Sequence, residues 1–237
     1  MIAYVFYSHY DYSDVWSLLF GQSEKFLKSQ TKYLITNEVG DFDTKDWNII
    51  LYDDALSYQE RVYKSLDKVK EEKVIFHHED MFLLKHPNFA KIQILSNQID
   101  EGRFDFIKLV KASYNHQQHQ KIHDNIYLNP SNLSFSIQPT IIEKKVLSDI
   151  YRYTKGSNIW SFEKNSNNYV NYLNLKSCYY FESKENKRGL FHWDSDVYPY
   201  IATAVVKGKW DYECYSEELT ELMHEYKLDP DMRGKNV

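Results

Sequence analysis

Short apolar runs alternate with amphipathic stretches along the first half of the chain, which is the pattern of strand and helix in turn. Compact apolar runs predict buried strands at 2–7, 33–35, 47–52, 74–76 and 104–110. Apolar residues at helical spacing predict helices over 14–28 (capped by Ser13), from the Ser57–Glu60 capping box to Val69, and through Phe89, Ile92, Leu95 and Ile99. Because the strands are apolar on both faces, we predict an α/β fold with a mostly parallel central sheet flanked by helices.

The second half of the chain is less regular. We predict strands at 133–137, 178–181 and 200–206, a helix through 146–151, and a final amphipathic helix that ends near Tyr226. The polar stretch 155–172 predicts a loop. No repeat and no low-complexity linker divides the sequence, so we expect one domain over 1–237 with a C-terminal extension.

Composition places this chain among globular proteins, because 43% of its 237 residues are hydrophobic. A chain of this length can bury a core large enough to be stable without disulfide bonds or structural metal ions. Cys178 and Cys214 are predicted to be thiols of a reducing compartment. No apolar stretch reaches the roughly 18 residues of a membrane span and no leader precedes the first strand, so we expect a cytoplasmic protein. The net charge of −5, without a basic stripe, predicts no nucleic-acid partner.

Polar side chains follow several predicted strands at the point where each strand ends. Ser8, His9 and Asp11 follow the first strand, Asp53 and Asp54 follow the third, and the cluster 77–80 (HHED) follows the next. In open α/β sheets, ligands bind outside the carboxyl ends of the strands. We therefore expect a ring of carboxylates and imidazoles at one edge of the sheet.

The distribution of glycines argues against phosphate binding by a glycine-rich loop and favours phosphate binding through a metal ion. All seven are isolated from one another, so the sequence contains no glycine-rich phosphate loop. A phosphorylated ligand would then be held through a divalent cation on carboxylates, because Mg²⁺ and Mn²⁺ prefer oxygen ligands and bridge diphosphates.

The order of these elements, with "FHHEDMFL", "YQERVYKSL", "IQPTI" and "IWSFE", resembles a GT-A glycosyltransferase. The acidic segment is similar to the Glu-Asp variant of the Asp-x-Asp motif that some bacterial and large-virus members carry, with His78 at the first position of the motif. The resemblance covers about residues 1–165. It implies a GT-A-like (Rossmann-like) sheet, a nucleotide-binding half over 1–112, and an acceptor half with the C-terminal extension over 113–237.

The resemblance also implies roles for individual residues. Asp80 and His192 would bind Mn²⁺ or Mg²⁺, and Glu163 would be the catalytic base of an inverting enzyme. The flanking aromatic residues of Glu163 independently favour a raised pKa, which suits a general base. The donor would be a nucleotide sugar and the acceptor a glycan or lipid-linked saccharide. The residues predicted to bind the nucleotide sugar are Tyr7, Ser8, His9, Asp53, Asp54, Arg61, Glu79 and Trp160.

Simpler interpretations stand beside this one. Asp53–Asp54 and Glu79–Asp80 also fit ordinary caps, Glu163 fits a surface loop, and Trp160 fits packing. Two other functions remain open: a non-enzymatic carbohydrate-binding protein, and a metal-dependent phosphoesterase or nuclease that uses His9, Asp11, His78, Asp80 and His192. A separate group, His116, His119 and His123, is spaced three and four residues apart, which on a helix would place three possible zinc ligands on one face. Its polar surroundings instead predict a loop over the acceptor.

Overall fold

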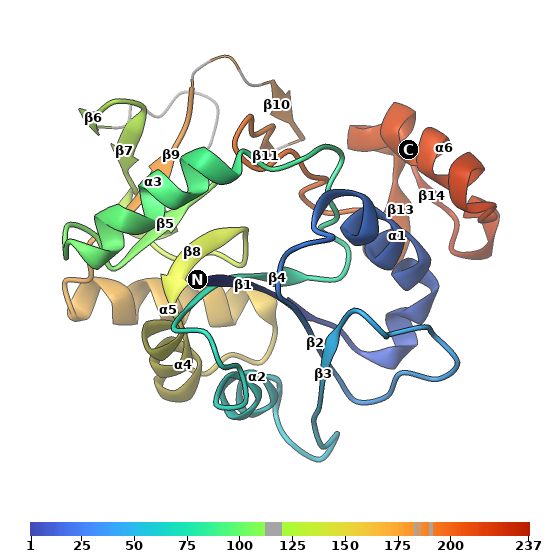
Figure 1. Ribbon diagram of the computed structural model, residues 1–237, viewed down its shortest axis with the longest axis horizontal. Helices are drawn as coiled ribbons and strands as arrows, with labels where there is room; N and C mark the ends of the chain where they lie inside the picture. The colour runs from blue at the N-terminus through green and yellow to red at the C-terminus, as the bar shows by residue number, and fades with distance from the viewer. Residues whose placement is uncertain (112–119, 183, 185, 190–191) are drawn as a thin grey trace.

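The computed structural model describes residues 1–111, 120–182, 184, 186–189 and 192–237, and nine strands of these segments form one sheet (Figure 1). From one edge to the other they are β3 (Asn48–Leu51), β2 (Lys32–Thr36), β1 (Ile2–Tyr7), β4 (Lys73–His78), β8 (Thr140–Glu143), β5 (Phe106–Lys108), β9 (Ser177–Tyr180), β7 (Ile126–Leu128) and β6 (Lys121–His123). Only β8 and β7 run against the direction of the other strands in this sheet. The predicted α/β fold with a mostly parallel sheet is confirmed, and strands from both predicted halves share it.

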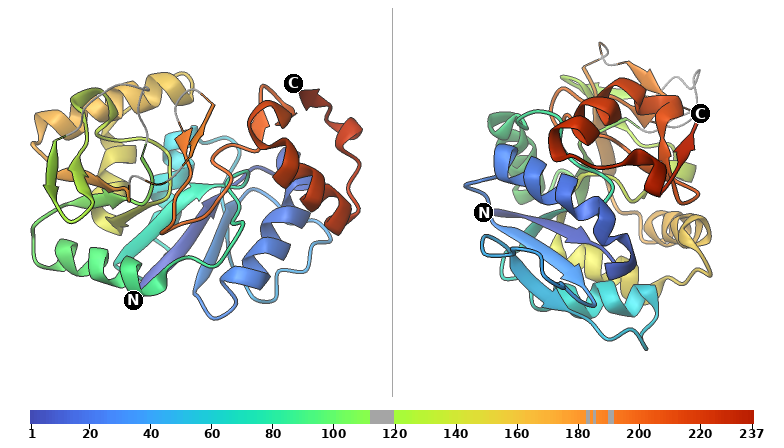
Figure 2. Two further views of the ribbon diagram at one scale, coloured as in Figure 1. Left: turned by 90° about the horizontal axis from the view of Figure 1, so that it is seen from above. Right: turned by 90° about the vertical axis from the view of Figure 1, so that its right-hand side faces the viewer.

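Helices cover both faces of the sheet (Figures 1 and 2). One face carries α1 (Trp16–Phe26) and α3 (Phe89–Asp100). The opposite face carries α2 (Tyr58–Leu66), α4 (Lys144–Tyr153) and α5 (Ile159–Tyr172). Strands β1 and β4 lie between these two layers, and their side chains are almost entirely buried, which explains why both read as apolar runs.

The C-terminal part of the chain packs beside α1. It contains α6 (Tyr212–Tyr226) and a small sheet of β12 (Val205–Val206), β13 (Lys209–Asp211) and β14 (Lys235–Asn236), after the hairpin of β10 (Lys187–Arg188) and β11 (His192–Trp193). The Tyr226 hydroxyl donates a hydrogen bond to Gln22 Oε1 of α1 at 2.9 Å. Of the helices in the described ranges, none combines the length and apolar character needed to cross a bilayer.

The first helix begins later than the sequence predicts. A 3₁₀ helix, η1 (Tyr10–Val15), precedes α1, so Ser13 caps nothing and the predicted range 14–28 shrinks to Trp16–Phe26. His9 starts the 3₁₀ turn, because its ring accepts a hydrogen bond from the Asp11 backbone N–H. The predictions for α2, α3, α4 and α6 are confirmed, although α2 ends at Leu66 rather than at Val69.

The predicted loop over 155–172 is wrong, because this segment contains α5. Asn158 and Ser161 form a reciprocal cap at its start, and Phe162, Ser166 and Val170 are buried at four-residue spacing. The predicted strand at 133–137 is also wrong. It follows a 3₁₀ turn, η2 (Ser131–Leu133), and its backbone bonds to side chains of α5 instead of to a neighbouring strand.

Other predicted segments also change. Of the predicted strand 200–206, only Val205–Val206 is a strand, and the predicted strand 104–110 is reduced to Phe106–Lys108. His116 and His119 lie outside the described residues. His123 lies on the exposed strand β6 of a hairpin and not on a helix or loop.

Gly156 permits the close approach of the chain to the first turns of α5. A Cβ atom at this position would lie 2.3 Å from the backbone nitrogen of Phe162 and 2.5 Å from its Cα. Because backbone atoms cannot move aside cheaply, Gly156→Ala is expected to lower the free energy of unfolding by about 1–3 kcal/mol. Denaturant unfolding would measure the loss. The neighbouring exposed substitution Ser157→Ala is the control, and equal midpoints for the two variants would contradict this packing role.

Candidate active site

A cavity of about 570 Å³ lies at the carboxyl ends of β1 and β4 and is closed on one side by α5. Its lining comes from segments that are far apart in the sequence. The residues in this lining that the sequence predicts for a site are Tyr7, His9, Glu79, Asp80, Trp160, Glu163 and His192. The strand ends and α5 therefore bring acidic, imidazole and aromatic side chains to one hollow.

Glu79 and Asp80 form an acidic pair directly after β4. Both side chains are buried, and neither has a cationic partner at ion-pair distance among the described residues. Asp80 Oδ2 accepts a hydrogen bond from the Val205 backbone N–H at 3.3 Å. Burial raises the pKa of both carboxyl groups, and for Glu79 the adjacent Asp80 charge adds to the rise. A bound cation would therefore stabilise the ionised form of this pair.

Glu163 lies on α5, in another part of the lining. Its Oε1 accepts a hydrogen bond from the Ile137 backbone N–H at 2.8 Å, which leaves the second carboxylate oxygen without a hydrogen bond among the described residues. Burial raises the pKa of Glu163, while this hydrogen bond and the charge of Lys108 lower it. The result is a carboxylate with increased basicity that borders the cavity, as a general base requires.

The wall next to Glu163 is fixed by a ladder of side chains from α5. Asn167, one turn after Glu163, accepts from the Phe135 backbone N–H at 2.8 Å and donates to its carbonyl at 3.0 Å. One turn further on, Asn171 donates to the Ser131 carbonyl at 2.7 Å. The segment 131–138 therefore has its polar backbone satisfied by a helix and borders the cavity without being part of the sheet.

A relay of hydroxyl and imidazole groups borders the same cavity. The Tyr58 hydroxyl lies 2.9 Å from His78 Nε2 and 3.0 Å from the Tyr151 hydroxyl. Burial lowers the pKa of His78 to about 4, so this ring is neutral at pH 7. Tyr58 has no predicted role, although the Ser57–Glu60 capping box places it on the first turn of α2.

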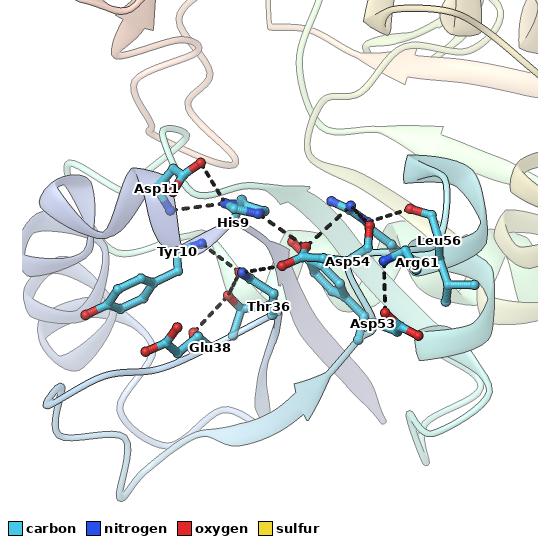
Figure 3. A network of polar contacts seen from close by, with 12 residues as sticks. His9, Tyr10, Asp11, Thr36, Glu38, Asp53, Asp54, Leu56 and Arg61 are labelled. Carbon is cyan, nitrogen blue, oxygen red and sulfur yellow. Dashed lines mark hydrogen bonds and ion pairs between the residues drawn. The ribbon is translucent and has the colours of Figure 1, made fainter.

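His9 connects the cavity to a polar network at the ends of β1 and β3 (Figure 3). Its Nδ1 lies 3.3 Å from an Asp11 carboxylate oxygen, and its Nε2 lies 3.3 Å from Asp54 Oδ1. Arg61 donates to the backbone carbonyls of Leu56 and Asp54 at 2.8 and 2.6 Å, and its guanidinium lies 3.4 Å from Asp54 Oδ1. Asp53 Oδ1 accepts from the Ala55 backbone N–H at 2.9 Å.

Four residues predicted to bind the nucleotide sugar do not line the cavity: Ser8, Asp53, Asp54 and Arg61. Ser8 is fully buried and its hydroxyl accepts a hydrogen bond from Trp16 Nε1 at 2.8 Å. The polar groups of Arg61 are directed to the turn before α2, as the close-up shows (Figure 3). Asp54 pairs with His9 of the cavity lining and with Arg61, which in turn interacts with Tyr7 of the lining.

His192 and Trp160 complete the predicted set. The Gln138 amide lies 3.3 Å from His192 Nδ1, and burial lowers the pKa of this imidazole to about 4, so the ring is neutral. Trp160 is 78% exposed and presents its ring at the cavity. Across the described ranges, no three His, Cys, Asp or Glu side chains form a metal-binding group.

Comparison with known proteins rests on structure, because no protein-family model and no curated protein sequence matches the chain. TarS residues 1–349 from S. aureus superimpose with a TM-score of 0.50 and 14% identity, over 95% of this chain and 64% of that chain. The complex of the same TarS fragment with UDP gives 0.50 and 13%, over 97% and 66%. The bifunctional IspDF from Campylobacter jejuni gives 0.45 and 13%, over 75% and 48%.

The protein has a GT-A-like fold. This chain spans just under two thirds (64%) of the length of the TarS fragment. At these identities the likeness concerns the arrangement of helices and strands, so the chemistry of the site has to be argued from the residues of this chain.

Proposed function

We propose that this protein is a glycosyltransferase that moves a sugar from a nucleotide-sugar donor to a hydroxyl of a glycan or lipid-linked saccharide. One observation carries the proposal: a single cavity is lined by an acidic pair, Glu79 and Asp80, with no ion-pair partner among the described residues, and by a separate carboxylate of raised pKa, Glu163. An inverting transfer that depends on a metal uses both kinds of group, since a cation on the acidic pair holds the diphosphate while a base deprotonates the acceptor hydroxyl.

Glu163 is the proposed general base of an inverting reaction. As the acceptor proton passes to Glu163, the acceptor oxygen forms its bond to the anomeric carbon. The bond between that carbon and the diphosphate oxygen breaks on the opposite face of the sugar, and the diphosphate leaves with the electron pair. The raised pKa of Glu163 favours this role, because a more basic carboxylate takes the proton more readily. Trp160 offers an exposed ring on which a sugar can stack.

Asp80 and the neutral imidazole of His192 are proposed to hold Mn²⁺ or Mg²⁺, with Glu79 beside them. The residues fit such an ion, because two buried carboxylates lie side by side with no cationic partner at ion-pair distance among the described residues, and the charge of Arg233 offsets their burial only in part. Few protein ligands suffice, since Mg²⁺ usually keeps water and substrate phosphates in its coordination shell. A bound cation would supply positive charge to the leaving diphosphate.

Uridine diphosphate is the first nucleotide to test. A solved structure with this arrangement of elements, that of TarS, contains UDP. UDP is also the product that a UDP-sugar donor leaves behind. We propose that Tyr7, the last residue of the buried strand β1, and His9, which follows it, contact the nucleotide in the cavity.

Melting temperatures in the presence of UDP, GDP and CDP, each with and without Mn²⁺, test this proposal. One nucleotide together with Mn²⁺ is expected to raise the melting temperature, because a ligand at about 100 times its Kd adds about 2.7 kcal/mol to the free energy of unfolding. Transfer of sugar from the matching nucleotide sugar to a saccharide acceptor would then be measured directly.

The competing functions give different results in the same set of measurements. Release of phosphate from simple phosphoesters, without any nucleotide sugar, would replace the proposal by a phosphoesterase. Stabilisation by saccharides alone, with no response to any nucleotide, would replace it by a carbohydrate-binding protein.

A further inference from the structure

Lys108 is a charged residue in the interior of the protein. It lies on β5 within the apolar run 106–110, and its side chain is only 1% exposed. Its Nζ donates a hydrogen bond to the Leu133 carbonyl, and no carboxylate lies within ion-pair distance among the described residues. A buried ammonium without a partner in direct contact is costly, so its presence calls for an explanation.

Among the described residues, the charge that acts on this ammonium is that of Glu163. Lys108 and Glu163 are attached to the same segment, because Lys108 bonds to the Leu133 carbonyl and Glu163 bonds to the Ile137 N–H. Both Leu133 and Ile137 line the cavity. The segment 131–138, which the α5 side chains hold in place, thus fixes the ammonium and the carboxylate relative to each other.

We propose that Lys108 is a positioning residue for the base Glu163: its buried ammonium, anchored on the Leu133 carbonyl, keeps the neighbouring carboxylate ionised and ready to accept a proton. This inference rests on the proposed function of Glu163. Burial alone would protonate Glu163 at a higher pH, and a fixed positive charge nearby opposes that effect.

The other titratable groups that act with Glu163 are the hydroxyls of Tyr58 on α2 and Tyr151 on α4. Burial raises the pKa of both tyrosines far above the neutral range, so both stay uncharged. Burial lowers the pKa of Lys108 to about 7. Among these groups, Lys108 is therefore the one whose charge is adjustable near neutral pH.

Lys108→Met keeps the length of the side chain and removes its charge. In this variant the acidic limb of the pH profile of kcat/KM is expected to move upward by about one pH unit or more, because Glu163 loses the charge that favours its ionised form. Lys32→Met is the matched control. Lys32 is also 1% exposed and also donates to backbone carbonyls, but its acceptors, Leu27 and Lys28, do not line the cavity, whereas Leu133, the acceptor of Lys108, does. It is expected to lose stability without a change in the pH profile.

A second measurement needs no activity and uses folded, nearly isosteric protein. The titration of Lys108 is followed by NMR on lysine labelled with ¹³C at Cε, in the parent and in Glu163→Gln. Because coupling between two titrating groups is reciprocal, removal of the Glu163 charge is expected to lower the pKa of Lys108 by about one unit or more.

An unchanged Lys108 titration in Glu163→Gln would overturn the inference, as would a Lys108→Met enzyme whose acidic limb stays at the parental pH. A coupled titration in a protein that transfers no sugar would instead support the pairing of the two residues and count against the proposed function. The two failures are therefore distinguishable.

Discussion

Replacing Glu163 by glutamine is expected to lower kcat by about 10²–10⁴-fold, the usual contribution of a general base, with no loss of affinity for UDP and Mn²⁺. Glutamine keeps a carbonyl oxygen that can accept the hydrogen bond from the Ile137 N–H, so the cavity wall stays in place. What it removes is the site that takes the acceptor proton. Initial rates of sugar transfer and calorimetric titration with UDP would separate the two effects.

A control is needed because Glu163 also helps to hold the wall of the cavity. Asn167→Ala removes both hydrogen bonds to the Phe135 backbone, one helical turn away, and leaves the carboxylate of Glu163 in place. We expect this variant to lose more stability than Glu163→Gln and much less turnover. If Glu163→Gln transferred sugar at the parental rate, or if Asn167→Ala lost activity to the same degree, Glu163 would not be the base.

The position of the cavity was predictable from the sequence, because it follows from a general property of parallel sheets. Strands β1 and β4 are neighbours and parallel, so the residues that follow them emerge at the same edge. Tyr7 at the end of β1, His9 after it, and Glu79 and Asp80 after β4 do line one cavity. The apolar character of both strands was sufficient to locate these positions.

The same property fails for the third strand of the sequence. Strand β3 is at the edge of the sheet, separated from β1 by β2, and the turn that follows it uses its own polar groups locally. Asp53 bonds to the Ala55 N–H, as an ordinary turn residue would, and Asp54 pairs with Arg61 and with His9 but does not line the cavity. Sequence pattern predicted that these acids follow a strand, but not how far that strand lies from the cavity.

The cavity wall formed by α5 and the segment 131–138 could not be predicted from the sequence, because polar side-chain contacts hold it together. The inner face of α5 contains Ser166 and Asn167, which broke the apolar spacing and made the segment look like a loop. The segment 131–138 looked like a strand, yet its partners are side chains of this helix. Lys108 is the residue whose sequence context could have indicated this wall, since a lone lysine in an apolar run predicts a buried charge. A buried charge is costly and therefore suggests a functional role.

The two halves of the sequence contribute different chemistry to this cavity. The acidic pair follows β4 in the first half, whereas Glu163 and its supporting segment belong to the second half. The two halves are joined where β8 of the second half lies between β4 and β5 of the first half in the same sheet. A rigid sheet therefore fixes the distance between the proposed diphosphate site and the proposed base, as a reaction between two bound substrates requires.

Replacing Asp80 by asparagine is expected to have opposite effects on binding and on stability. The stabilisation by UDP and Mn²⁺ together, about 2.7 kcal/mol at 100 times Kd, should be lost because the proposed metal ligand loses its charge. The ligand-free protein should become more stable at pH 7.5, since asparagine removes the buried charge of Asp80 and keeps an oxygen for the Val205 N–H. Denaturant unfolding and thermal melts with and without ligand would measure both effects.

The pH dependence of this gain has a definite sign. Burial raises the pKa of Asp80 from 3.8 to about 6, so between these values the folded protein binds more protons than the unfolded chain. The contribution of Asp80 to stability therefore falls as the pH rises through this window, and the advantage of Asp80→Asn should be larger at pH 7.5 than at pH 5. Asp100→Asn, which removes the exposed partner of Lys73 outside the cavity, is the control and should show no such gain. An Asp80→Asn protein that is less stable than the parent at pH 7.5, or that keeps the ligand-induced rise, would show that this carboxylate serves the fold and not a cation.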